Sequence, residues 1–314
     1  MKILFITLLL TSVFSFACEK NKSRCKNNPV QLVVLGITQD AGYPQLNCYK
    51  PHCMPGWQDP KLKKMATSLG LIDLINEKKY LFEATPDIRQ QLYNLHTNAS
   101  DKEYTLEGVF LTHAHIGHYT GLMHMGREAA ATKNLPVYVM PKMKQFLINN
   151  APWSQLINLN NIALKDLKDQ QTLQLTQNIK IQPLIVPHRD ELSETVGFKI
   201  YGPSKTVLFI PDINKWEKWN KNIVNEIRQV DYALLDATFF ENGEIPNRDM
   251  SEIPHPFVSE SMQLFSDLSI QEKNKIIFIH LNHSNPLLQK NSEAQKKVLS
   301  KGFKIAFEGM KLEL

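Results

Sequence analysis

The stretch Leu111-Thr112-His113-Ala114-His115-Ile116-Gly117-His118 places three histidines within six residues, directly after the apolar run 109–111. Side chains of a strand alternate between its two faces, so a strand running into this stretch points His113 and His115 to the same side. His118 follows at the start of a helix predicted over 118–132. Three imidazoles at this spacing indicate a divalent metal site at the edge of a sheet, rather than a loop that is merely rich in histidine.

The composition is that of a folded globular protein. Of the 314 residues, 43% are hydrophobic, and the formal net charge is +5. This hydrophobic fraction can form a large core, which argues against a disordered chain. The sequence contains no basic stripe interleaved with aromatic residues, so nucleic-acid binding has no support and we expect a small-molecule substrate.

The N-terminus has the pattern of an export signal. Lys2 precedes an almost uninterrupted apolar run over 3–16, which ends before the small residue Ala17. The run is too short to span a bilayer comfortably, and its features predict a signal peptide over 1–17. Cys18 resembles the lipidated cysteine of bacterial lipoproteins, and a plain secretory signal is the alternative.

These features predict an exported protein, a periplasmic or outer-membrane lipoprotein of a bacterium that a lipid on Cys18 attaches to the membrane. Ser15 stands where the lipoprotein signal usually has Leu. The polar, Lys-rich segment 18–29 is predicted to be a flexible tether. A single folded domain is expected over 30–314.

Alternating apolar residues and turn signals predict a chain of mixed strands and helices. Strands are expected over 31–37, 70–75, 80–84, 107–112, 135–140, 179–186, 196–201, 206–210, 231–237, 275–280 and 303–307. Helices are expected over 87–95, 118–132, 142–149, 216–230, 258–268 and 292–300, with β-rich character over 153–177 and an irregular loop over 243–256. This order suggests a layered α/β fold with the helices outside.

Three further polar residues follow predicted strands. His188 comes after the strand over 179–186, Asp212 after the strand over 206–210, and His280 ends the strand over 275–280. Each alone has an ordinary explanation, as a loop residue, a turn former and a core histidine respectively. Together with the three histidines at 113–118 they form an ordered set.

This set resembles the signature of the metallo-β-lactamase fold superfamily, which is H-x-H-x-D-H, a later His, an Asp after a strand and a final His. Within it the chain is similar in particular to the coenzyme PQQ biosynthesis protein B family. The segments that carry this resemblance are 34–36, 42–48, 85–91, 120–122, 235–239, 280–286 and 307–310. The resemblance implies an αββα sandwich over almost all of the chain after the tether.

The resemblance also implies a site for one or two zinc ions, or for Mn²⁺ or Fe in their place. The first metal would be bound by His113, His115 and His188, the second by His118 and His280, and Asp212 would be shared. Three neutral imidazoles and a water form the pattern of a catalytic zinc site with an open position.

The chain departs from these families at two points. The PQQ protein B family lacks the first histidines of the motif, whereas this chain keeps His113 and His115, which favours a hydrolytic protein. Gly117 stands where the superfamily has Asp, a ligand of the second metal. We therefore expect an asymmetric centre, with a tight first site and a weak or empty second one.

A bound zinc lowers the pKa of its water from 15.7 to about 7. The predicted function is therefore that of an exported hydrolase, in which a metal-activated water attacks a phosphodiester or an ester or lactone bond. The alternatives are an oxygenase or carrier like those of PQQ biosynthesis, and a non-catalytic lipoprotein that binds a metal or ligand.

The predicted catalytic residues are Asp212, Asp236 and His255. Asp236 and His255 resemble the carboxylate–histidine relay of tRNase Z relatives, which protonates a leaving group. The alternative is that Asp236 only orients a ligand histidine from behind.

Cys48 and Cys53 form a local pair with His52 between them. In an oxidising compartment they could form a disulfide. The other interpretation is a structural zinc site, since phosphodiesterase relatives hold such a zinc with loop cysteines and a histidine that matches His283. Lys50 stands where those relatives have their middle cysteine, and His52 could take its place.

Overall fold

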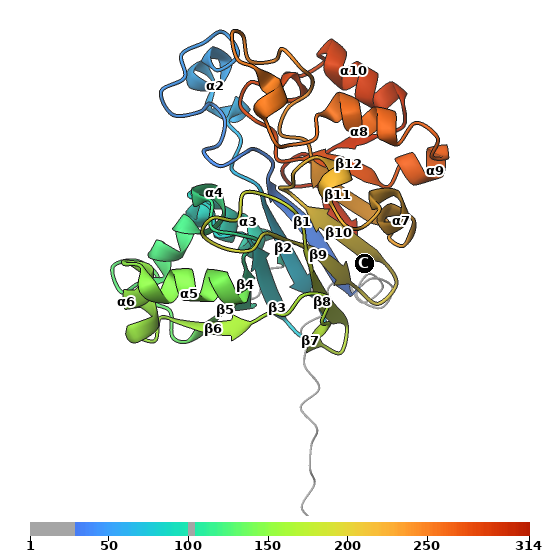
Figure 1. Ribbon diagram of the computed structural model, residues 1–314. Helices are drawn as coiled ribbons and strands as arrows, with labels where there is room; N and C mark the ends of the chain where they lie inside the picture. The colour runs from blue at the N-terminus through green and yellow to red at the C-terminus, as the bar shows by residue number, and fades with distance from the viewer. Residues whose placement is uncertain (1–28, 100–103) are drawn as a thin grey trace, which may run out of the picture.

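The computed structural model describes residues 29–99 and 104–314. The predicted signal peptide, the predicted lipidation site Cys18 and the tether as far as residue 28 lie outside the described residues. Within that part of the chain, two sheets of seven strands each pack face to face (Figure 1). In spatial order, the first sheet holds β14 (Lys311–Glu313), β1 (Val30–Gly36), β2 (Ser68–Asp73), β3 (Lys78–Phe82), β4 (Thr105–Phe110), β5 (Leu135–Val139) and β6 (Ile162–Asp166). The second holds β13 (Lys304–Ile305), β12 (Ile276–Ile279), β11 (Tyr232–Asp236), β10 (Thr206–Ile210), β9 (Val196–Tyr201), β8 (Ile179–Ile185) and β7 (Leu173–Thr176).

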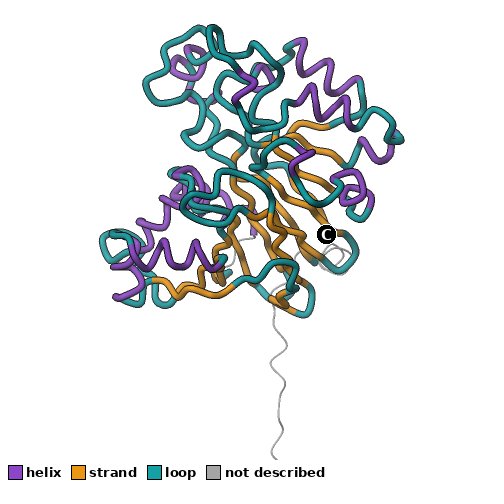
Figure 2. The backbone as a smooth tube through the Cα atoms, viewed as in Figure 1, coloured by secondary structure: helices purple, strands orange, loops and turns teal. Residues whose placement is uncertain are grey.

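Helices cover the outer faces of both sheets (Figure 2). The first sheet is covered by α3 (Ile88–Ala99), α5 (Pro141–Asn149) and α6 (Trp153–Asn158), and the second by α7 (Ile223–Arg228), α8 (Val258–Leu264) and α10 (Glu293–Ser300). Shorter helices are α2 (Met54–Gln58), α4 (Ile116–Tyr119) and α9 (Ile270–Lys273), with 3-10 turns η2 (Pro60–Leu62), η3 (Thr120–Met125), η4 (Trp216–Lys218), η5 (Met250–Glu252) and η6 (Pro286–Leu288). In residues 29–99 and 104–314, no helix has both the length and the apolar character needed to cross a bilayer.

The period-two alternation of the strands builds separate cores on the two faces of each sheet. In β1, Leu32 points into the core between the sheets, whereas Val33 points to the helices outside. The central core is rich in aromatic side chains, and the rings of Phe82 and Phe110 stack with centroids 4.9 Å apart. Phe198 of the second sheet meets Phe82 edge to face at 5.3 Å. The predicted αββα sandwich is therefore confirmed.

The strand directions bring the carboxyl ends of many strands to one edge of the sandwich. β4 pairs parallel with β3 and β5, and β11 pairs parallel with β10 and β12. At this edge the ends of β1 and β12 are joined, because Leu281 N donates to Ile37 O (2.8 Å) and Gln39 N donates to Leu281 O (2.9 Å). Residues that directly follow these strands therefore gather at a single place.

Several predicted helices are shorter than expected. The helix predicted over 118–132 gives way to η3 and a turn, because Ala84 N donates to His118 O and Gly121 N donates to Ala84 O. The helix predicted over 216–230 splits into η4 and α7, since the side chain of Asn222 caps a new helix start. The segment predicted to be β-rich over 153–177 begins instead with α6.

Candidate metal centre

The three histidines after β4 meet at this edge of the sandwich. β4 ends at Phe110, and His115, with an extended backbone conformation, directly precedes α4. His113 Nε2 lies 2.8 Å from His115 Nδ1, and the rings of His113 and His118 are 4.3 Å apart. The three side chains converge as predicted, although the regular strand ends before them.

Asp212, after β10, joins these histidines to His188, after β8. Asp212 Oδ1 lies 3.2 Å from His188 Nε2, and Oδ2 lies 3.3 Å from His113 Nε2 and 4.0 Å from His115 Nδ1. Ligand atoms around a tetrahedral zinc, each at its usual bond length, lie about 3.3 Å from one another. The spacing of these four residues therefore suits one metal ion.

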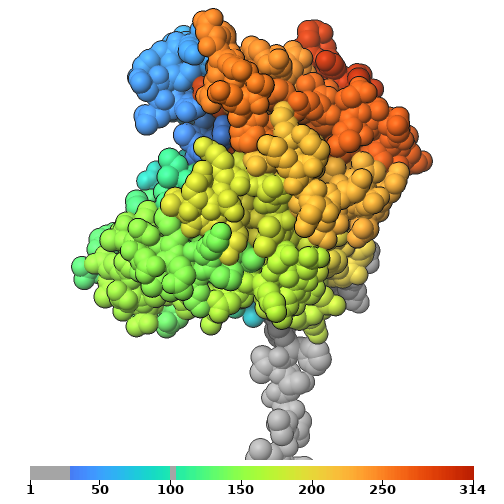
Figure 3. All heavy atoms as spheres, viewed as in Figure 1, coloured from blue at the N-terminus to red at the C-terminus, as the bar shows by residue number. Residues whose placement is uncertain are grey.

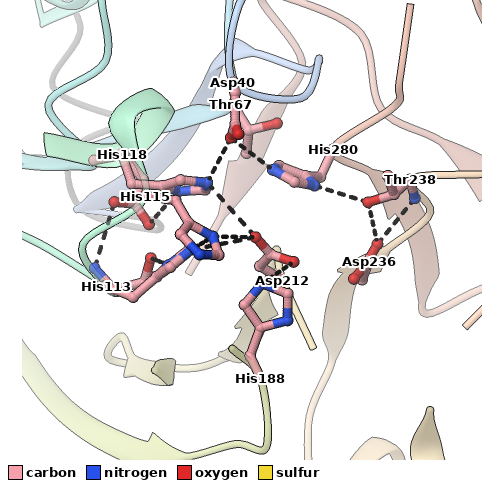
Figure 4. Close-up of polar contacts among 12 residues, drawn as sticks. Asp40, Thr67, His113, His115, His118, His188, Asp212, Asp236, Thr238 and His280 are labelled. Atoms are coloured by element: carbon pink, nitrogen blue, oxygen red, sulfur yellow. Dashed lines mark hydrogen bonds and ion pairs between the residues drawn. The ribbon is translucent and has the colours of Figure 1, made fainter. Parts of the chain in front are cut away.

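A second group lies on the other side of Asp212 (Figure 4). His118 Nε2 is 3.8 Å from Asp212 Oδ2, and the rings of His118 and His280 are 5.3 Å apart. Asp40 Oδ1 lies between these rings, 3.2 Å from His118 Nε2 and 3.9 Å from His280 Nε2. The structure thus brings together all six predicted ligands and adds a seventh residue, Asp40.

Asp40 corrects one prediction. The sequence led us to expect a second metal site that lacks a carboxylate, because Gly117 replaces the Asp of the motif. That expectation is wrong, since Asp40 brings a carboxylate to the same place from the loop after β1. The signal was present, because Asp40 follows a predicted strand just as Asp212 does.

The centre contains buried polar atoms that make no hydrogen bond within the described residues. These atoms are Asp40 Oδ1, Glu83 Oε1, Asp212 Oδ1, both ring nitrogens of His118, and Nε2 of His188 and His280. Burying a polar group without a partner costs free energy, so a native protein rarely leaves several such groups in one place. The cluster fits divalent metal ions, which would take the two Asp oxygens and the three Nε2 atoms as ligands.

Neighbouring side chains contact the Nδ1 atoms of four of these histidines, on the side of each ring that faces away from the centre. His280 Nδ1 lies 3.0 Å from Thr238 Oγ1, and His113 Nδ1 lies 2.8 Å from Thr112 Oγ1. The remaining pairs are His118 Nδ1 with Glu83 Oε1 at 3.4 Å and His188 Nδ1 with Asn214 Oδ1 at 3.3 Å. These contacts leave Nε2 to face the centre in each case, as is usual for metal-bound histidines.

The protonation of three of the rings agrees with a role as ligands, which requires the neutral form. Burial lowers the pKa of His188 to about 4, lowers that of His280, and holds that of His113 well below its ordinary value. His118 differs, because the carboxylates of Glu83 and Asp40 outweigh burial and hold its pKa well above its ordinary value.

Asp236 and His255 form the predicted pair behind the ligands. Asp236 Oδ2 lies 2.8 Å from His255 Nδ1 and accepts from Ile213 N. Burial disfavours the charged imidazole, but the carboxylates of Asp236 and Asp212 prevail and raise the pKa of His255 to about 9. Asp236 Oδ1 also accepts from the hydroxyl of Thr238, which contacts the predicted ligand His280. Asp236 is therefore placed both to pair with His255 in a proton relay and to orient His280 through Thr238.

A cavity of about 380 Å³ opens beside the centre. Asp40 and His255 lie on its wall, together with Phe239 and two exposed arginines, Arg189 and Arg248. Figure 3 shows the surrounding loops, where the segment around α2 (blue) meets the segment after β11 (orange) at this end of the molecule. A ligand in this cavity would therefore meet the metal centre, the relay and positive charge together.

The predicted second cluster forms next to this cavity. Cys48 and Cys53 are free thiols, and Cys48 Sγ lies 3.5 Å from His52 Nε2. The rings of His52 and His283 are 5.4 Å apart, and the possible ligand atoms of all four residues lie within 4.8 Å of one another. Burial and the neighbouring His52 lower the pKa of His283 to about 4. Two thiols and two neutral imidazoles suit a structural zinc.

Comparison with known proteins confirms the fold. The family model of the β-lactamase superfamily domain matches residues 78–281. Coenzyme PQQ synthesis protein B of Acinetobacter baumannii (strain ACICU) is 25% identical, and the alignment covers 91% of this chain and 100% of the length of that protein. The same protein of Rhizobium meliloti (strain 1021) is 24% identical over 92% of this chain and 99% of its own.

Two solved structures share the fold. Zn²⁺-bound PqqB from Methylobacterium extorquens is 20% identical and superposes with a TM-score of 0.76, covering 90% of this chain and 100% of that one. A diphosphatase of the PhnP family is 20% identical with a TM-score of 0.63, covering 91% of this chain and 97% of that one. The chain belongs to the β-lactamase superfamily, with the metallo-β-lactamase fold. Among its members it is similar to the PQQ synthesis B proteins.

Replacing Cys53 by Ser separates the two interpretations of the cysteine cluster. If zinc binds the two thiols, the Cys53→Ser variant should show one thiol fewer than the wild type when both are denatured without a reductant. The variant should also bind about one equivalent of zinc less. Thiol titration in denaturant with a chelator, together with metal analysis, measures both. A gain of one thiol in the variant would show that Cys53 had been disulfide-bonded to Cys48, and would contradict the prediction.

Proposed function

We propose that this protein is a metal-dependent hydrolase that acts on an anionic substrate, with a phosphodiester as the first candidate. The observation that carries the proposal is that one cavity is lined by Asp40 of the metal-ligand cluster, by His255 of the His255–Asp236 pair and by two arginines. Its fold is that of a superfamily with metal-dependent hydrolases, which supports the class of reaction.

The metal, when bound, activates a water molecule for attack and offsets the negative charge that develops on the substrate. The protein contributes the fixed geometry. Asp212 and the histidines position the ions, and outer contacts such as Thr238 to His280 hold the rings in place. His255 is then placed to give a proton to the leaving group, with Asp236 orienting its ring.

The charge around the cavity favours an anionic substrate. Arg189 and Arg248 line it, and within the described residues neither forms an ion pair with a carboxylate. A guanidinium presents paired donors that match phosphate and carboxylate oxygens. A phosphodiester fits this arrangement, and an ester or lactone fits if it carries its own negative charge.

A second function has one specific observation in its favour. The similarity to PQQ synthesis protein B extends over the full length of that protein. This supports an oxygenase or carrier like those of PQQ biosynthesis, which would bind a small acidic molecule in the same cavity without hydrolysing it.

The place of action is also a proposal. The apolar run over 3–16 and Cys18 support an exported protein with a lipid anchor, in the periplasm or on the outer membrane of a bacterium. Such a protein would meet its substrate outside the cytoplasm. The alternative is a lipoprotein that binds a metal or ligand without catalysis, and a measurement of hydrolysis distinguishes the two.

Hydrolysis of bis-p-nitrophenyl phosphate tests the proposed activity. We expect the metal-loaded protein to release p-nitrophenolate, and the His115→Ala variant to fall to background because it loses a ligand of the first metal. His96→Ala is the matched control, since His96 is exposed on α3 away from the centre, and it should keep full activity. If the fully metal-loaded protein hydrolysed no diester or ester, the proposal would be contradicted.

The role of His255 predicts a dependence on the leaving group. We expect His255→Ala to lower kcat by about 10²-fold for a phenyl phosphodiester, whose leaving group needs a proton. The loss should be much smaller for the p-nitrophenyl ester, whose leaving group is stable as an anion. Equal losses on both substrates, with metal content unchanged, would show that His255 only supports the structure.

A further inference from the structure

The position of Asp40 relative to Gly117 is the starting observation. A Cβ atom added at Gly117 would lie 2.5 Å from Asp40 Oδ1 and 2.7 Å from its Cβ, and closer still to its Cα. The side chain of Asp40 therefore occupies the space that the motif Asp would need. The two carboxylates exclude each other, so a chain with Asp at 40 in this conformation requires Gly at 117.

The carboxylate of Asp40 faces two buried imidazoles. Its Oδ1 is buried without a hydrogen-bond partner among the described residues, as are Nε2 of His118 and Nε2 of His280. The side chains of His118 and His280 are 2% and 0% exposed. Three buried atoms that make no hydrogen bond and face one another in this way form an incomplete ligand sphere, which the nearby Oδ2 of Asp212 extends.

The backbone holds Asp40 in this position. Gln39 N donates to Leu281 O, which anchors the loop beside the residue that follows His280. Gly42 turns the chain back with φ of +78°, and its N donates to Gln39 O at 3.1 Å. The position of Asp40 is therefore built into the connection between the two sheets.

We propose that Asp40 is the carboxylate ligand of a second divalent metal, which it binds together with His118, His280 and Asp212. It takes the place of the Asp that the superfamily motif has at the position of Gly117. The centre is then a two-metal site, not the asymmetric one that the sequence predicted. This inference rests on the proposed metal-dependent function and adds the source of its second metal.

Metal counting tests this ligand without any substrate. After dialysis at a fixed free zinc concentration, Asp40→Asn should hold one equivalent less than the wild type, with at least about a tenfold weaker Kd for that equivalent. Asp190→Asn is the matched control, because Asp190 is an exposed carboxylate that follows Arg189 in the chain and is not part of the ligand cluster, so this variant should keep full zinc content.

Two results would overturn the inference. One is Asp40→Asn that keeps every equivalent at unchanged affinity. The other is a wild-type protein that holds a single metal at the active centre, which would leave Asp40 as an ion-pair partner of His118. Since these are counts of bound metal, they are independent of whether bis-p-nitrophenyl phosphate is the right substrate.

A thiolate at position 40 gives a direct signature of ligation that does not depend on the Asp40→Asn variant folding well. Cobalt-loaded Asp40→Cys should show thiolate-to-cobalt charge-transfer absorption beyond that of the wild type, and the extra band should grow with the second equivalent. Asp190→Cys should show none. Absence of the extra band in folded, fully loaded Asp40→Cys would count against direct bonding.

Discussion

The buried carboxylate of Asp212 is the interaction on which the centre depends. One oxygen faces His188 and His255, and the other faces His113 and His118, so a single side chain couples both groups of ligands. An ionised carboxylate buried in a protein is costly unless charges and hydrogen bonds compensate it. Burial would raise the pKa of Asp212, but the surrounding imidazoles hold it well below its ordinary value. The histidines and Asp212 therefore require one another, and metal ions would complete the balance.

The sandwich serves to bring these residues to one edge. Each ligand follows the carboxyl end of a strand, and two residues there adopt left-handed backbone conformations, Glu83 at φ 71° and His280 at φ 67°. Such conformations cost about 1–3 kcal/mol for residues other than glycine. They occur where β3 and β12 end. There the carboxylate of Glu83 faces His118 and the imidazole of His280 faces Asp40, and His118 and Asp40 are themselves an ion pair. The packed core of the two sheets provides the stability that tolerates this strain.

The sequence predicted the fold and the six side chains that meet at the centre because both depend on local patterns. Alternation marked the strands, and polar residues after strand ends marked the ligands. The sequence analysis did not identify Asp40, although this residue follows a predicted strand, because its place beside His118 and His280 depends on hydrogen bonds between the ends of β1 and β12, which are far apart in the chain. The helix predicted over 118–132 is shorter for a similar reason, since tertiary contacts at Ala84 replace its hydrogen bonds. The helix predicted over 216–230 is divided by a local feature, the side chain of Asn222 that caps the start of α7.

Anomalous scattering at the zinc edge from crystals of the zinc-loaded protein tests the central claim most directly. The account predicts two peaks at the active centre. One should lie among His113, His115, His188 and Asp212, and the other among Asp40, His118, His280 and Asp212. A single peak at the first position, with the carboxylate of Asp40 bonded only to His118, would contradict it.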